Sequence, residues 1–304
     1  MLSIIFPSRF KNNPDNNLLE FLRSIYNTTS TEQRKNIEVL IKFDSDDDLV
    51  PDEFKIASLK EQYIISTRQY CQVATIEGIK VRSFFYERGE GRSDINNVLS
   101  YLGTLVNPCS ELIMNAADDF LFVTDSWYKE LFNKYNFAKK RNGGYIIFGE
   151  ASTVTNYSYS AKPHTFLDLP DFNQLISYNA GVNSSALNKY IGEYCPIFSK
   201  KIFNVLSGQF WMPSIDAYFA LLNAFLVLKF NINIYCRLNN FYKRTSKNDL
   251  RHKRDKFIES GGTKYNFNEV SGYYGVPRNK SFYALVEQQA KNIYLNIKSD
   301  GLWT

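Results

Sequence analysis

The stretch Ile37–Asp48, IEVLIKFDSDDD, decides how the chain folds. Its first seven residues are mostly apolar and β-branched, which predicts a buried strand, and an acidic cluster follows directly. Upstream, Leu2–Phe6 is a similar run stopped by Pro7, and Asn16–Tyr26 has apolar residues at helical spacing. A strand, a helix and a second strand build a parallel sheet, in which ligands bind at the carboxyl ends of the strands. The acidic cluster therefore lies where a ligand is expected.

The rest of the chain continues this βαβ pattern and predicts an α/β fold with a mostly parallel central sheet flanked by helices. Residues 1–240 are expected to form the main domain and residues 241–304 a basic loop and helical extension packed on it. The expected elements are helices at 53–62, 94–105, 126–135, 189–202, 216–228 and 281–296, strands at 71–75, 80–86, 111–115, 145–149 and 232–238, and a strand with a turn at 174–187.

Composition limits the classes of function. With 304 residues, 44% of them hydrophobic, the chain can bury a sizeable core. A net charge of +5 without a basic stripe argues against a nucleic-acid partner. The longest apolar stretch, Ala217–Phe230, contains Asn223 and Lys229, and the N-terminus has no basic region, so neither a transmembrane segment nor a signal peptide is expected. Four widely spaced cysteines predict neither a zinc site nor disulfides, which fits the reducing cytoplasm.

Two adjacent acids, Asp118 and Asp119, follow the apolar strand predicted at 111–115. Two like charges are costly to desolvate together unless a cation lies beside them, and a divalent ion meets that need. Mg²⁺ or Mn²⁺ accepts one or two carboxylates and completes its shell with phosphate oxygens and water. The competing interpretation is a helix N-cap with a second acid favoured by the helix dipole.

The acidic cluster Asp44–Asp48 strengthens the metal interpretation, because it is a second acidic strand end in the same sheet. Asp44 is placed to accept a hydrogen bond from a base, and a neighbouring acid to contact a ribose hydroxyl. The cluster lacks the glycine and distal glutamate of an EF-hand. An acidic surface loop is the alternative. Taken together, the two strand ends favour a nucleoside diphosphate and its metal.

Four segments give the chain a resemblance to a known family. They are Ser3–Arg9 (SIIFPSR), the helix around Leu18–Tyr26, Glu38–Asp47 (EVLIKFDSDD) and Ala117–Trp127 (ADDFLFVTDSW). This arrangement resembles the opening of family 2 glycosyltransferases with the GT-A fold, and it lies within the first 130 residues. The family carries an aspartate motif after its fourth core strand, followed by a helix that contains a tryptophan.

The resemblance implies roles for residues in the first half. Asp44 would contact the nucleotide base, usually uracil, and Asp118 and Asp119 would occupy the DXD-type motif that holds Mn²⁺ or Mg²⁺. The sequence departs from the common form because Ala116 stands where a first Asp is frequent. Residues expected to bind the nucleotide sugar are Pro7, Ser8, Arg9, Asp44, Asp46, Arg88, Arg92 and Asp118. For Arg88 and Arg92, an exposed turn is the alternative.

The second half offers two further candidates. Ser207–Trp211 and Ile215–Tyr218 look like the family's glycine loop and the acidic motif that supplies the catalytic base, here Asp216. Plain N-capping is the alternative for this aspartate. His252, in a run of Lys and Arg residues, would return to the metal as a third ligand, with a solvated basic loop as the equal alternative.

The expected function is therefore metal-dependent, inverting transfer of a hexose from a nucleotide sugar, most often a UDP-sugar, to a hydroxyl of a glycan, protein or lipid-linked acceptor. Residues 1–130 would bind the donor and residues 131–240 the acceptor. A nucleotidyltransferase is a rival, although the expected glycine-rich basic loop is absent after Leu2–Phe6. A non-catalytic glycan- or nucleotide-sugar-binding module is another, supported by Ala116.

Overall fold

The computed structural model describes residues 1–11, 13, 16–55, 63–66, 69–87, 93–116, 120–125, 127–150, 194–206, 215–238, 242–244 and 280–300. The chain divides into two compact units that alternate along the sequence. The first comprises Met1–Asn133, Ile197–Phe210 and Asn240–Tyr265, and the second Lys134–Pro196, Trp211–Asn239 and Asn266–Thr304.

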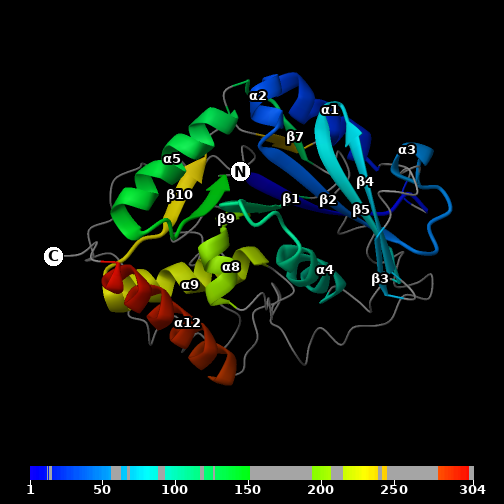
Figure 1. Cartoon of the computed structure of the whole chain (residues 1–304). Helices are drawn as coiled ribbons and strands as arrows, with labels where there is room; N and C mark the ends of the chain where they lie inside the picture. Colours follow the sequence, from blue (N-terminus) through cyan, green and yellow to red (C-terminus); the bar gives the residue numbers. More distant parts are fainter. Residues whose placement is uncertain are drawn as a thin grey trace. The chain divides into compact units, whose positions relative to one another are not determined.

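The first unit is built on an open, mixed sheet with β1 (Leu2–Ser8) in its interior (Figure 1). β1 pairs in parallel with β2 on one side and with β6 on the other. Outward from β2 come β5, which is parallel, and then β4 and β3, which are antiparallel to their neighbours; β9 is antiparallel to β6. The bounds are β2 Ile37–Asp44, β3 Tyr63–Ser66, β4 Gln69–Ile76, β5 Ile79–Tyr86, β6 Leu112–Asn115 and β9 Tyr194–Ser199. The predicted α/β class with a largely parallel core is thus observed.

Pro7 does not end β1, contrary to the sequence prediction, because it lies where the strand needs no donor. Ala116 N donates to Ile5 O, so the odd-numbered residues of β1 direct their backbone polar groups toward β6. β6 ends at Asn115, beside Ile5, so the described ladder has no partner at the level of Pro7. The missing N–H therefore costs no hydrogen bond of the described ladder.

Helices cover both faces of this sheet. Phe6 of β1 contacts Phe21 of α1 (Leu18–Thr28) with ring centroids 5.0 Å apart. Tyr86, on the opposite face, meets Tyr101 of α4 (Ser93–Thr104) edge to face. Figure 1 shows α1 and α4 on either side of the strands. Smaller elements complete the unit: α2 (Thr31–Arg34), α3 (Asp52–Lys55), α8 (Lys200–Val205), and the pair β7 (Phe120–Phe122) and β11 (Tyr242–Arg244).

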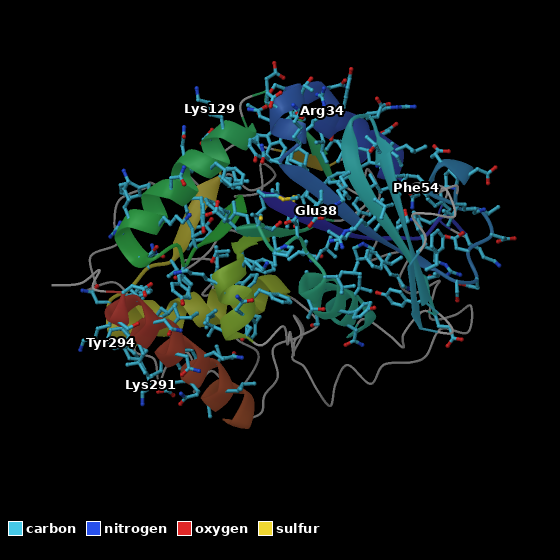
Figure 2. All side chains as sticks on the ribbon, in the orientation of Figure 1. Arg34, Glu38, Phe54, Lys129, Lys291 and Tyr294 are labelled. Atoms are coloured by element: carbon cyan, nitrogen blue, oxygen red, sulfur yellow. The ribbon has the colours of Figure 1, made fainter. Side chains whose placement is uncertain are left out.

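A buried carboxylate anchors the amino end of the sheet. Glu38 is 1% exposed and accepts hydrogen bonds from Ser3 Oγ at 2.5 Å, Asn107 N at 2.6 Å and an Arg82 guanidinium nitrogen at 3.1 Å. Its place within the strands is labelled in Figure 2. These bonds fix the connection between α4 and β6, and with it the start of β6.

The second unit contains the parallel strands β8 (Ile147–Glu150) and β10 (Tyr235–Leu238) and the helices α9 (Ile215–Phe230) and α12 (Lys280–Ser299). The buried hydroxyl of Tyr218 on α9 bonds to Gln289 on α12, and Phe230 stacks on Tyr294 with centroids 4.5 Å apart. The helix α5 (Trp127–Asn142) begins in the first unit and ends in the second. No helix in the described part of the chain is long and apolar enough to span a membrane.

Two local predictions were wrong. From Tyr194 on, the helix expected at 189–202 is replaced by β9 and the short α8, because Pro196 cannot occupy a helix interior. The strands at 71–75 and 80–86 form an antiparallel hairpin, not a further parallel crossover. Glu77 and Gly78 both have positive φ, as a tight hairpin turn requires. The prediction for 174–187 falls outside the described residues.

Candidate functional site

The strand order of the first unit reverses between β1 and β6. From β1 the chain crosses through α1 to β2 on one side, and later returns through α4 to β6 on the other. In open α/β sheets, ligands bind outside the carboxyl ends of the strands at such a switch point. The residues that end β1, β2 and β6 therefore make up the candidate site.

Four charged side chains meet at the carboxyl ends of β1 and β2, and we call them the Arg9 cluster: Arg9, Lys42, Asp44 and Asp46. Arg9 pairs with Asp44, and its two terminal nitrogens bond to the two oxygens of Asp46 at 3.0 and 3.1 Å. Lys42 pairs with the other oxygen of Asp44. The side chains of Lys42 and Asp44 are only 3% and 6% exposed, whereas Asp46 is 61% exposed. The cluster thus has a buried ion pair, Lys42 with Asp44, and one accessible carboxylate, that of Asp46.

The loops around the cluster are fixed by a second set of bonds. Asp47 is buried, and its carboxylate accepts from Phe10 N at 2.6 Å and Lys11 N at 3.0 Å. Asn16 donates from its amide to Ser8 Oγ at 2.9 Å and to Arg9 O at 2.8 Å. The segment after β1 is therefore held against the segment after β2, which keeps the Arg9 cluster in one arrangement.

Arg9 and Asp46 each stabilise the charged form of the other. The hydrogen bond from Arg9 lowers the pKa of Asp46 below its ordinary value, and the same bond, with that of Asp44, raises the pKa of Arg9. Asp44 uses two of the roughly four acceptor positions of a carboxylate on Arg9 and Lys42. Its carboxylate can still accept a hydrogen bond from one more donor, such as an N–H group of a nucleotide base.

Asn115, the last residue of β6, adds an unusual polar atom to the switch point. The residue is 9% exposed, and its Oδ1 atom is buried with no hydrogen-bond partner among the described residues. Asn115 lies beside Ile5, so its side chain projects on the same face of the sheet as Pro7 and Lys42. A buried carbonyl oxygen without a donor is costly, so the Oδ1 atom of Asn115 is a candidate acceptor at this edge of the sheet.

The structure brings five of the predicted nucleotide-binding residues together: Pro7, Ser8, Arg9, Asp44 and Asp46. Asp216 is the second residue of α9, in the second unit. The other predicted residues lie outside the described part of the chain: Arg88, Arg92, Asp118, Asp119 and His252. Asp118 and Asp119 come three and four residues after the end of β6.

Sequence reasoning missed Lys42, Asp47 and Asn115. Lys42 interrupts an apolar strand on the same face as Glu38 and Asp44, and this period of two was the available signal. Asp47 was treated as one acid among several, yet it is the one that supports the neighbouring loop. Asn115 ends the run Leu112–Asn115, and only its burial without a partner distinguishes it.

Neither a scan against models of known protein families nor a search of curated proteins finds a significant match for the chain. Within the described ranges, no three His, Cys, Asp or Glu side chains come together as a metal site.

Proposed function

We propose that the chain is a metal-dependent, inverting glycosyltransferase with a GT-A type fold, related to family 2, which takes a hexose from a UDP-sugar. One observation carries the proposal. The Arg9 cluster and the end of β6 lie at the switch point of the sheet, and the sequence Ala116-Ala117-Asp118-Asp119 follows β6. This is the edge at which an open α/β sheet binds a nucleotide.

Donor binding would begin at the Arg9 cluster. The carboxylate of Asp44, held by Arg9 and Lys42, would accept a hydrogen bond from the uracil ring, and Asp46 would accept one from a ribose hydroxyl. The fixed orientation of Asp44 lowers the entropy lost on binding. Arg88 and Arg92 would contact the phosphates, where a guanidinium can bond to two oxygens at once.

The residues at the end of β6 fit a hard divalent ion. Mg²⁺ and Mn²⁺ prefer oxygen ligands, and Asn115 offers a buried oxygen that has no hydrogen-bond donor in the described part of the chain. Asp118, Asp119 and His252 would hold the ion. When bound, Mn²⁺ or Mg²⁺ stabilises the negative charge of the departing diphosphate.

Asp216 would act as the general base. It lies in the first turn of a sixteen-residue helix, where the helix dipole favours the ionised carboxylate. Asp216 would take the proton of the acceptor hydroxyl as that oxygen attacks the anomeric carbon. The bond from this carbon to the diphosphate oxygen breaks in the same step, so the configuration inverts and UDP leaves with the bonding electrons.

A second function is favoured by one observation. Ala116 is buried, and its backbone continues β6 by donating to Ile5 O at 2.9 Å. It has no side-chain oxygen for a metal at the position where the family frequently has a first Asp. A module that binds nucleotide sugars or glycans without turnover would fit this departure.

The two functions are separated by a donor screen. The purified full chain is incubated with Mn²⁺ and a panel of nucleotide sugars, and release of nucleoside diphosphate is followed. We expect slow release from one UDP-sugar, lost in Asp119→Ala and in Asp216→Ala. Asp52→Ala is the matched control, because this aspartate is 82% exposed on α3 and outside the site.

Binding of a UDP-sugar without any release, in the original chain as in both site variants, would support the non-catalytic module. Release that survives in Asp119→Ala would contradict the metal-dependent mechanism.

A further inference from the structure

The last two turns of α5 expose a phenylalanine among positive charges. Phe137 is 66% exposed, more than any other large apolar side chain in the described part of the chain. Lys140 and Arg141 follow it at spacings of three and four, so they lie beside the ring on the helix surface. Both of these cations are exposed. We call Phe137, Lys140 and Arg141 the α5 face.

The charge of α5 is strongly one-sided. The helix contains five basic residues and a single acid, Glu130, which lies in its first turn. No acid follows in the last three turns, where Lys134, Lys139, Lys140 and Arg141 are placed. The α5 face therefore has no acid on its own helix to neutralise it.

Helix stability alone does not explain this arrangement. Basic residues in a last turn complement the helix dipole, which accounts for Lys140 and Arg141. It does not account for Phe137, because an exposed aromatic ring contributes nothing to the dipole and loses the free energy of burial. Cations and an exposed aromatic ring are two of the features by which a helix surface meets lipid headgroups.

We propose that the α5 face binds the surface of an anionic lipid bilayer, with the Phe137 ring entering the boundary between headgroups and acyl chains. Lys140 and Arg141, on either side of the ring, would meet the lipid phosphates and carboxylates. A nucleic acid fits less well, because the face offers one aromatic ring and no extended basic stripe. This proposal does not depend on the transferase activity.

The test is co-sedimentation of the full chain, without nucleotide or metal, with vesicles of phosphatidylcholine alone or mixed with phosphatidylserine. We expect binding only to the mixed vesicles, weakening as salt is raised. Removing both cations in Lys140→Gln/Arg141→Gln should weaken binding about 25-fold, from about fivefold for each basic residue near the surface. Phe137→Ser should weaken it about tenfold.

Matched controls come from α12. Lys291 and Lys298 are exposed on this helix, and Lys291 is labelled in Figure 2. Lys291→Gln/Lys298→Gln removes the same charge, and Leu295→Ser removes an apolar side chain that is 49% exposed. The apolar side chain between these cations is an aliphatic leucine and is less exposed than Phe137, so we expect both control variants to lose much less binding than the α5 variants.

Equal binding to both kinds of vesicle, or no binding to either, would overturn the proposal. So would an equal loss in the α5 and α12 charge variants, because net charge would then be the cause. If the α5 variants lose binding to a single-stranded oligonucleotide but keep vesicle binding, the face is a nucleic-acid surface and the proposal is wrong.

Discussion

Asp44→Asn tests whether the Arg9 cluster is a fixed ionic arrangement. The substitution keeps the side-chain shape but removes the charge that neutralises Lys42, whose side chain is 3% exposed. Breaking a buried ion pair by removing one partner costs about 3–5 kcal/mol. We expect the low end, about 3 kcal/mol, because asparagine retains one acceptor oxygen. With a urea slope of about 3 kcal/mol per molar, the unfolding midpoint should fall by about 1 M.

Two variants test whether the loss of stability comes from the unneutralised, buried Lys42. Asp46→Asn removes an equal charge from the same loop, but the side chain is 61% exposed, so its loss should stay below about 1 kcal/mol. Lys42→Met/Asp44→Asn removes the buried pair together and should recover most of the midpoint. An Asp44→Asn midpoint no lower than that of Asp46→Asn, or a double variant less stable than Asp44→Asn, would refute the reasoning.

Three further outcomes follow from the described residues. Glu38→Gln should lower stability by about 3 kcal/mol in urea unfolding, because an amide cannot accept from all three donors around Glu38; the control Glu32→Gln, on a side chain 80% exposed, should change little. Gly103→Ala should cost about 1–3 kcal/mol in the same assay, since a Cβ atom would lie 2.3 Å from the Phe203 ring. Arg9 lowers the pKa of Asp46 in the folded chain below its ordinary 3.8. The interaction between Arg9 and ionised Asp46 therefore stabilises the fold fully above pH 3.8, and this stabilisation is lost as pH falls through the lower pKa of the folded state. The small difference between the original chain and Asp46→Asn should therefore vanish between pH 5 and strongly acidic pH, and a difference that grows there would contradict the assignment.

The central strands were readable because burial imposes a clear pattern on them. All eight residues of β2 are buried, and the mostly apolar run with an acidic end correctly predicted the strand. That its carboxyl end binds a ligand stays a prediction. The helix α4 was likewise predicted within a residue at each end. The charged residues at the strand ends led to the prediction of Arg9, Asp44 and Asp46, which lie together.

Other features depend on contacts that sequence patterns do not encode. The helix predicted at 189–202 failed because its apolar spacing suits a helix as well as a strand, and only Pro196 and the pairing of β9 with β6 distinguish the two. The ion-pair partner of a charged residue in a strand is equally hard to predict from the sequence. Lys42 and Asp44 are two residues apart and meet only because β2 places both on one face.

Calorimetric titration of the chain with UDP, with and without Mn²⁺, tests the central claim most directly, because it measures the donor site without requiring an acceptor. We predict that UDP binds with Mn²⁺, that Asp119→Ala abolishes the dependence on Mn²⁺, and that Asp52→Ala does not. We also predict that Asn115→Ala weakens binding by about tenfold or more, as loss of a group that supports a metal site does. Absence of UDP binding, or binding that is the same with and without Mn²⁺ in the original chain and in Asp119→Ala, would contradict the account.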